Sequence, residues 1–531
     1  MKKLTNNSPR RIAIAIILMC LPLSLAKGQP AAYWNMDFPT SESGPAQQHF
    51  LEGVTAMHLH MFEDAQEHFQ AAQEIAPDFA MAYWGEALNN HRTIWRIHRR
   101  DEAREVLARL APTAEARAAK APTAREKAYL HAVELLFGEG TQAERQWAYA
   151  EAMRELSEAY PEDMEARAWY ALSLMRETPP DRTREQTRSL LASLSLEVLA
   201  SNPRHPGANR YLIQSTDDPV NTDLGIIAVN NLQMLDLQAA EALHIPSHYY
   251  IQHGMWRETA ESNMRAFESS MQWVADHDWQ LQDLNDHNYG HLLRFANYGF
   301  LQSGQLAKAA SIRTRVLGDF IASGKAAELA APLAEVFARH VVDLERWDLA
   351  MELTSLAEEH NLQQANIWTA IGIAAVRNGN VDLAERALAR LGDNGGAASE
   401  GAIGSLQVQG LLYLAQGNNQ AALDALQQAI EVNTTMNKER PVTLIGIPPR
   451  PIKPSHELYG EALLALDRGD EALQAFQTGL TIYQGRTNML MGALAASLMT
   501  GDAEAGERYV RQLHEAWEIA DVQHPFKPHL P

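Results

Sequence analysis

The sequence predicts an all-α fold, a right-handed α-solenoid of antiparallel helix pairs, and three observations lead to this prediction. Small and aromatic residues recur at the same spacing near both ends of the chain. Between these ends, apolar residues repeat with the period of a helix rather than with the alternation of a strand. Runs rich in Val, Ile and Thr are absent except at residues 441–447, so we expect essentially no sheet.

The first residues have the pattern of a secretory signal peptide, in which basic residues precede an apolar run over 12–26. This run is shorter than the about 20 apolar residues of a membrane-spanning helix. We therefore expect residues 1–26 to be removed, leaving an exported, periplasmic chain without a membrane span. Met19 is larger than the residue that usually precedes a lipidated cysteine, so we expect no lipid anchor at Cys20.

The repeats begin after an expected linker at residues 27–45. Small residues at Gly53 and Ala65 allow two helices to approach closely, Phe69 fills the space between them, and Pro77 ends the second helix. This order is the tetratricopeptide pattern, and it returns near the other end at Gly460, Ala472 and Phe476.

Weaker helix pairs connect the two clear repeats, with Gly or Asn at the turn between their helices. We divide them into N-terminal repeats over 46–200, central repeats with polar loops over 201–330 and C-terminal repeats over 331–531. Three stretches break the helical pattern and are predicted as loops: 177–184, 202–221 and the proline-rich 433–455.

Charge and motifs narrow the classes of function. The formal net charge of −21 repels phosphate, so we expect no nucleic-acid partner. No nucleophile elbow, phosphate-binding glycine loop, dinucleotide fingerprint or His-Glu-x-x-His helix is recognisable, so no catalytic residues are assigned. A binding protein is therefore expected in preference to an enzyme.

The clearest chemical signal is the pair His244 and His248, which lie four residues apart and can share one metal ion. Pro246 is best tolerated at the first position of a helix, which would place His244 in the incoming loop and His248 in the first turn. Two ligands do not complete a site, and both rings can instead be satisfied by hydrogen bonds. Asp217 and Asp218 can bind a cation or a basic ligand, or can form a turn that caps a helix.

The chain resembles a family of exported bacterial tetratricopeptide-repeat proteins that largely lack an assigned function. The resemblance covers about residues 58–525. It depends on these segments: 78–87, 125–130, 160–163, 202–207, 244–248, 254–256, 262–263 and 453–460. It implies a polar, histidine-rich pocket inside the superhelix, and its histidine positions match His58, His91, His244, His248 and His291.

The chain departs from the family where the family has further histidines, because Arg210, Gln214 and Asn221 stand there. Arginine is no metal ligand, so a pocket for an anion or a peptide carboxylate becomes a competing expectation. The residues assigned to such a ligand-binding pocket are Arg210, Gln214, Asp217, Asp218 and Asn263.

Three interpretations follow. The first is a periplasmic binding or scaffolding protein whose concave groove holds a peptide, a protein or a small ligand, because stacked helix pairs create long concave surfaces. The second is a metal-binding protein or metal-dependent enzyme that holds a divalent transition metal with His244, His248 and His291, joined by His58 or His91. The third is a structural repeat protein whose histidines only pack.

Overall fold

The computed structural model describes residues 31–175, 181–284, 286–392, 398–438 and 447–521 of the chain. The predicted signal peptide and Cys20 lie outside these residues, and so does nearly all of the strand candidate at 441–447. No helix among the described residues is both long and apolar enough to span a membrane.

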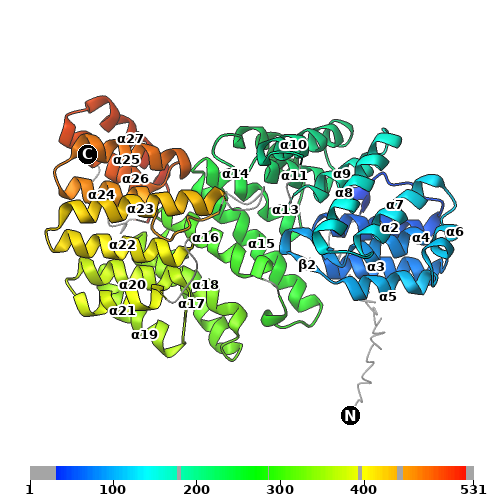
Figure 1. The fold of residues 1–531 in the computed structure, drawn as a ribbon, viewed down its shortest axis with the longest axis horizontal. Coiled ribbons are helices and arrows are strands. Elements are labelled where there is room, and N and C mark those ends of the chain that lie inside the picture. The colour runs from blue at the N-terminus through cyan, green and yellow to red at the C-terminus, as the bar shows by residue number, and fades with distance from the viewer. Residues whose placement is uncertain (1–30, 176–180, 285, 393–397, 439–446, 522–531) are drawn as a thin grey trace, which may run out of the picture.

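The described residues form an all-α solenoid, which confirms the predicted fold class (Figure 1). The N-terminal helices are α1 (Ala31–Trp34), α2 (Gly44–His58), α3 (Phe62–Ile75), α4 (Ala80–Leu88), α5 (Arg100–Leu110), α6 (Ala114–Lys120), α7 (Ala124–Leu136), α8 (Gln142–Ala159), α9 (Met164–Ser173), α10 (Arg184–Ser201), α11 (Pro206–Ser215) and α12 (Ile226–Gln233). The central helices are α13 (Ala240–His244), α14 (Pro246–Gln252), α15 (Trp256–Asp276), α16 (Gly290–Gln302), α17 (Leu306–Ala322) and α18 (Ala330–Val342).

The C-terminal helices are α19 (Ala350–Glu359), α20 (Ala365–Arg377), α21 (Val381–Gly392), α22 (Glu400–Ala415), α23 (Asn419–Lys438), α24 (Ser455–Ala465), α25 (Gly469–Ile482), α26 (Thr487–Thr500) and α27 (Ala503–Ala516). The short 3-10 helices in the described part of the chain are η1 (Thr93–Trp95), η2 (Thr222–Gly225), η3 (Leu281–Asp283), η4 (Asp286–Asn288), η5 (Ala327–Leu329) and η6 (Trp347–Leu349). Within the described residues, the strands are β1 (His91–Arg92) and β2 (Ile97–His98), which form one short antiparallel ladder.

The small residues of the repeat signature act as expected, because each leaves room for a ring. Phe69 on α3 lies between Gly53 and Gly85, and a Cβ atom at Gly85 would come within 2.3 Å of the Phe69 ring. Phe476 on α25 lies in the same way between Gly460 and Gly492, where a Cβ atom at Gly492 would again be 2.3 Å from the ring. The two ends of the chain thus use one packing device.

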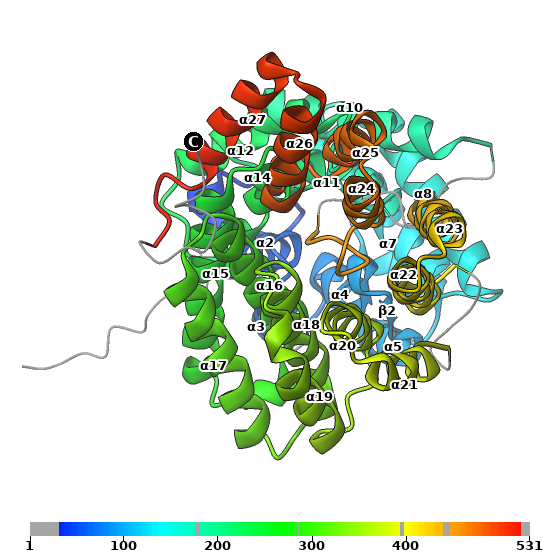
Figure 2. The same ribbon diagram turned by 90° about the vertical axis from the view of Figure 1, so that its left-hand side faces the viewer.

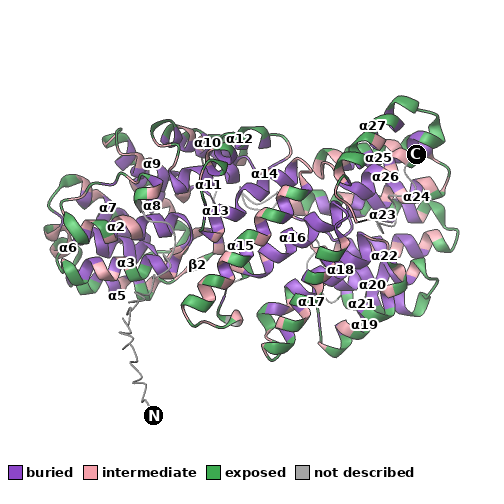
Figure 3. Cartoon of the chain, turned by 180° about the vertical axis from the view of Figure 1, so that it is seen from behind, coloured by how far each residue is buried: buried purple, intermediate pink, exposed green. Residues whose placement is uncertain are grey.

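Buried residues follow the inner faces of the helix pairs throughout (Figure 3).

The predicted linker and two of the three predicted loops contain regular structure, and residues 177–180 of the first predicted loop lie outside the described residues. Residues 31–34 form α1, and Trp34 and Phe38 are buried against the N-terminal repeats, so this segment is part of the core. The predicted loop over 202–221 contains α11, because His205 caps the helix and Pro206 occupies its first turn, where proline is tolerated. In the third predicted loop, α23 continues to Lys438.

The C-terminal half closes on itself. Viewed along the long axis, α15 to α27 surround the segment that precedes α24 (Figure 2). The Trp517 indole donates a hydrogen bond to the carbonyl oxygen of Gln302 at 3.0 Å, and the backbone N–H of Asp521 donates to the carbonyl oxygen of Gly304 at 2.9 Å. The last helices are therefore attached to the turn between α16 and α17.

The chain's own residues fill the inside of this closed half. Arg339 on α18 donates a hydrogen bond to the carbonyl oxygen of Pro449 at 2.8 Å, and Gln407 on α22 donates to the carbonyl oxygen of Lys453 at 2.7 Å. Arg486 is fully buried and lies 2.5 Å from a carboxylate oxygen of Glu457. The predicted concave groove is therefore not an open inner wall in this half of the molecule.

Candidate functional site

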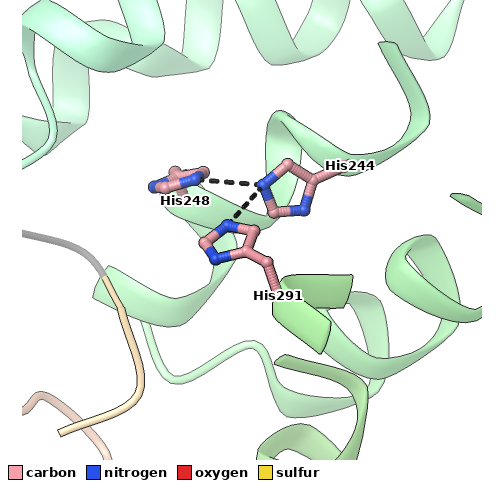
Figure 4. Close-up of side chains that lie close together, drawn as sticks. All are labelled: His244, His248 and His291. Atoms are coloured by element: carbon pink, nitrogen blue, oxygen red, sulfur yellow. Dashed lines mark hydrogen bonds between the residues drawn. The ribbon is translucent and has the colours of Figure 1, made fainter. Parts of the chain in front are cut away.

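Three of the five predicted histidines meet near the middle of the chain, and we call them the central histidine cluster: His244, His248 and His291 (Figure 4). His244 is the last residue of α13 rather than a loop residue, Pro246 begins α14 as expected, and His291 lies at the start of α16. The Nε2 atom of His244 lies 3.2 Å from that of His248 and 3.1 Å from that of His291.

The other ring nitrogens of His244 and His248 are held by polar side chains. Nδ1 of His244 lies 2.7 Å from Oδ1 of Asn263, and Nδ1 of His248 lies 2.9 Å from Oδ2 of Asp217. Gln252 donates a hydrogen bond to the second oxygen of Asp217 at 3.2 Å. Two residues predicted for a ligand pocket, Asp217 and Asn263, therefore contact the histidines directly.

Burial disfavours the charged form of two rings of the central histidine cluster, His244 and His291. It lowers the pKa of His244 well below 6.5, and the neighbouring His248 lowers this pKa further. Burial also lowers the pKa of His291 well below 6.5, with a further contribution from His244. Phe295 covers the cluster on one side, with its ring centroid 4.7 Å from that of His291.

Arg210 lies beside this cluster but faces a carboxylate. Its Nε lies 2.5 Å from Oε1 of Glu241, and its Nη1 contacts His60. The second oxygen of Glu241 lies 2.5 Å from Nε2 of His287, whose ring stacks on His291 at 4.9 Å. Burial alone would raise the pKa of Glu241, but Arg210 and His287 hold it well below 4.5. Glu241 is therefore an ionised acceptor shared by Arg210 and His287.

Two further predicted residues have different surroundings. Asp218 forms an ion pair with Arg188 at 2.5 Å, and its other oxygen accepts hydrogen bonds from the backbone N–H groups of Val220 and Asn221. Asp218 thus closes the turn before η2, as one of its two interpretations expects. Gln214 is buried on α11, and its side-chain oxygen has no hydrogen-bond partner among the described residues.

His58 belongs to a separate buried cluster with Glu165 and His205. Nε2 of His58 lies 3.0 Å from Glu165, Nε2 of His205 lies 2.9 Å from it, and Nδ1 of His58 lies 2.7 Å from the hydroxyl of Tyr211. Nδ1 of His205 accepts a hydrogen bond from the backbone N–H of Ala208, so its proton is on Nε2 and points to Glu165. Every polar atom of both rings therefore has a partner.

His91 is also separate from the central histidine cluster. It pairs with His98 across the β1–β2 ladder, with 3.1 Å between their Nδ1 atoms. Burial, together with His98, lowers the pKa of His91 to about 3. Arg145 donates a hydrogen bond to Nε2 of His98 at 3.1 Å, so this pair ties the ladder to α8.

A large pocket of about 940 Å³ is separate from the central histidine cluster, since none of the three histidines lines it. The start of α15, the end of α25 and the outer turns of α27 line it, together with Pro219 and Val220. Trp256 at its edge donates a hydrogen bond to the carbonyl oxygen of Gly485 at 3.2 Å. Arg257 and Arg508, together with Glu258 and Glu515, give its wall charges of both signs.

An apolar stripe on the surface reaches this pocket at Val220. We define the stripe as four exposed apolar side chains between the turn before η2 and the residue that follows α12, which are exposed by 86%, 48%, 41% and 76%: Val220, Leu224, Ile227 and Met234. The opposite face of α12 is buried through Ala228, Val229 and Leu232. An exposed apolar row on a helix that is already packed is typical of an interaction surface.

Sequence reasoning missed Glu165, Glu241 and His287, which bind the predicted residues. Glu241 lies three residues before His244 on α13, and this helical spacing could have predicted that the two side chains share one face. Glu165 comes from a helix far from His58 in the sequence, and no local pattern links the two residues.

Known proteins agree with a repeat architecture. The family model of the tetratricopeptide repeat matches residues 403–435. No curated protein matches the sequence.

Several solved structures share low identity and low structural overlap with the chain. Yeast Tom70 is 13% identical, covering 86% of this chain and 96% of its own, with a TM-score of 0.37. A monomeric IFIT1 mutant with Gppp-AAAA is 12% identical over 91% of this chain and 93% of its own, with a TM-score of 0.33. The Cut9–Hcn1 hetero-tetramer of the APC/C is 13% identical over 92% of this chain and 76% of its own, with a TM-score of 0.29. The repeat match, together with the paired helices, supports a protein built from tetratricopeptide repeats.

Proposed function

We propose that this chain is an exported, periplasmic repeat protein that binds another protein through the large pocket and the apolar stripe beside it. The observation that carries the proposal is that Val220 belongs to both the apolar stripe and the lining of the large pocket. Tetratricopeptide repeats support a protein-binding role in general. The basic leader at residues 1–26 supports export.

The partner we infer is a peptide segment with apolar side chains on one face. Four exposed apolar side chains in a row favour an apolar contact, since covering about 100 Å² of apolar surface contributes roughly 2.5 kcal/mol. The pocket wall carries both Arg257 and Glu258. It can therefore form ion pairs with acidic and with basic side chains at the edge of the bound peptide. Because the wall contains charges of both signs, it does not favour a strongly acidic or a strongly basic ligand.

The test is capture of a partner by the mature chain from periplasmic extract, followed by the same capture with a double variant, Val220→Asp with Leu224→Asp. We expect the double variant to lose at least about 90% of the captured partner, because two buried charges would replace apolar contacts. Met351→Asp is the matched control, since Met351 is 57% exposed on α19, outside the stripe and the pocket.

Two results would overturn the proposal. One is equal capture by the wild-type chain and the double variant, and the other is no captured protein at all. Light scattering of the purified chain distinguishes a third outcome, in which a second copy of the chain covers the stripe. Export is tested separately by N-terminal sequencing of the protein recovered from periplasmic extract, for which we expect a start near Lys27.

A further inference from the structure

The three Nε2 atoms of the central histidine cluster have the spacing of ligands around one ion. Two of the separations are 3.1 Å and 3.2 Å, and the three ligand atoms all lie within 4.8 Å of one another. Metal–nitrogen bonds of 2.0–2.1 Å in a tetrahedral zinc site place neighbouring nitrogens about 3.3 Å apart. The observed separations are close to that value.

The tautomer of His244 follows from its contact with Asn263. The Asn263 amide nitrogen donates a hydrogen bond to the carbonyl oxygen of Thr259 at 2.7 Å, which fixes the orientation of this amide. Its oxygen therefore faces Nδ1 of His244, and only a protonated Nδ1 can donate to it. In the neutral ring, Nε2 of His244 is then a bare lone pair.

The tautomer of His248 follows in the same way from Asp217. A carboxylate oxygen accepts at 2.9 Å, so Nδ1 of His248 carries the proton, and Gln252 holds the other carboxylate oxygen. In the neutral ring, Nε2 of His248 is then a bare lone pair as well. Two acceptors then face each other at 3.2 Å between rings that are at most 2% exposed. This contact is repulsive unless a proton or a metal ion lies between them.

A metal ion fits this position better than an extra proton. A proton on His248, paired with Asp217 on the Nδ1 side, would join Nε2 of His248 to Nε2 of His244, but it would not draw in Nε2 of His291 at 3.1 Å, as a metal ion bound by all three rings would. Histidines that bind metals commonly donate their other N–H to a carboxylate or a carbonyl oxygen, as His248 and His244 do here. All three ligand atoms are imidazole nitrogens, which suit zinc, copper and nickel and do not suit magnesium or calcium.

The other histidine groups lack this arrangement. In the cluster of His58 and His205, both Nε2 atoms point to the one carboxylate of Glu165, and no lone pairs face each other. His49 and His68 lie with Glu52 in a half-exposed group between α2 and α3, where water can reach each ring. The half-exposed group offers a control for adventitious metal binding.

We propose that His244, His248 and His291 bind one divalent transition-metal ion through Nε2, with zinc the ion that the spacing fits best. Asn263 and Asp217 are positioning residues that set the tautomers of two ligands. This site is independent of the proposed partner surface, because none of its three histidines lines the large pocket.

The experiment uses the mature chain without a histidine tag, stripped of metal by a chelator and titrated with Zn²⁺ by calorimetry. Co²⁺ replaces Zn²⁺ in a parallel titration, because its visible absorption reports tetrahedral nitrogen ligands. We expect one site per chain. His248→Ala and His291→Ala should each weaken Zn²⁺ binding at least about 100-fold, and Asp217→Asn about 10-fold to 100-fold through the lost contact to His248.

The matched control is the double variant His49→Ala with His68→Ala, which should keep the site. Far-UV circular dichroism verifies the fold of every variant, and His291→Ala provides a less buried test if His248→Ala fails to fold. The proposal is overturned if the wild-type chain binds no stoichiometric Zn²⁺, or if His291→Ala binds it as tightly as the wild type. Loss of binding only in the His49 and His68 variant would also overturn it.

Discussion

At the scale of single residues, Glu165 shows how one carboxylate orders two rings. Burial alone would raise its pKa, but His205 and His58 outweigh this effect and lower the pKa to about 2. Burial likewise lowers the pKa of His58 below 6.5, so this ring stays neutral and donates its proton to Glu165. Gly207 allows the arrangement, because a Cβ atom there would lie 2.4 Å from Nδ1 of His58.

Glu165→Gln should lower the free energy of unfolding at pH 7 by about 2 kcal/mol, because an amide has one acceptor oxygen for two N–H donors. The pKa of Glu165 is depressed, so its stabilisation is complete above its unfolded value of about 4.5 and is lost as the pH falls toward 2. Urea unfolding at pH 7 and pH 3 should therefore show that the free energies of unfolding of the wild-type chain and the variant differ less at pH 3. An equal difference at both pH values would contradict this assignment.

At the scale of the elements, the glycine and phenylalanine packing sets how closely neighbouring repeats stack. Phe476 lies against both Gly460 of its own pair and Gly492 of the next pair, so one ring joins three helices. Phe69 does the same with Gly53 and Gly85. Close-packed interiors tolerate added volume poorly, because the neighbours cannot move without strain.

Gly492→Ala should destabilise the chain by about 1–3 kcal/mol, because its Cβ atom would lie 2.3 Å from the ring of Phe476. Gly318→Ala is the control, since a Cβ atom at this exposed position on α17 has no neighbour within 4 Å. It should stabilise the chain by about 0.5–1 kcal/mol through the higher helix propensity of alanine. Thermal unfolding of the two variants should thus shift in opposite directions.

Part of this element-level structure was accessible from the sequence. Gly53, Phe69, Gly460 and Phe476 predicted the helix pairs, because their spacing reflects packing between adjacent helices. The helix α11 was missed, because its sequence begins with Pro206 and Gly207, which are typical of loops. Gly207 is kept there by its contact with His58, which comes from α2 and is invisible in a local pattern.

The candidate site was predictable only in part, for a similar reason. Two of its ligands, His244 and His248, are neighbours in sequence, and Pro246 at the start of α14 was expected. The approach of His291 depends on how α16 packs against α15, which residue spacing does not encode. The separation of His58 and His91 from this cluster likewise depends on tertiary structure, where each ring is satisfied by a different partner.

At the scale of the whole molecule, buried ion pairs and the returning C-terminal helices hold the C-terminal half together. Arg486 contacts Glu457 and, at 2.7 Å, Asp343 on the other side of the interior. Trp517 is 2% exposed and reaches the backbone of Gln302. These contacts connect segments that are far apart in the sequence, unlike the neighbour-to-neighbour contacts of an open repeat array.

Trp517→Ala should lower the stability of the chain by about 3–5 kcal/mol, because it removes a buried indole and leaves the Gln302 carbonyl oxygen without this donor. Trp517→Phe keeps most of the apolar volume and should cost less, about 1–2 kcal/mol. Guanidinium unfolding measures the free energy of unfolding of both variants. Equal losses in the two variants would show that neither the size of the indole nor its contact with Gln302 contributes much.

The return of α27 to the turn after α16 also affects how this half of the molecule unfolds. An open solenoid can lose its last repeat first and unravel stepwise, since each repeat is held only by its neighbours. Here residues 517–521 are fastened to residues 302–307, so there is no loose terminal repeat among the described residues from which fraying can start. We expect α15–α27 to open as one cooperative unit.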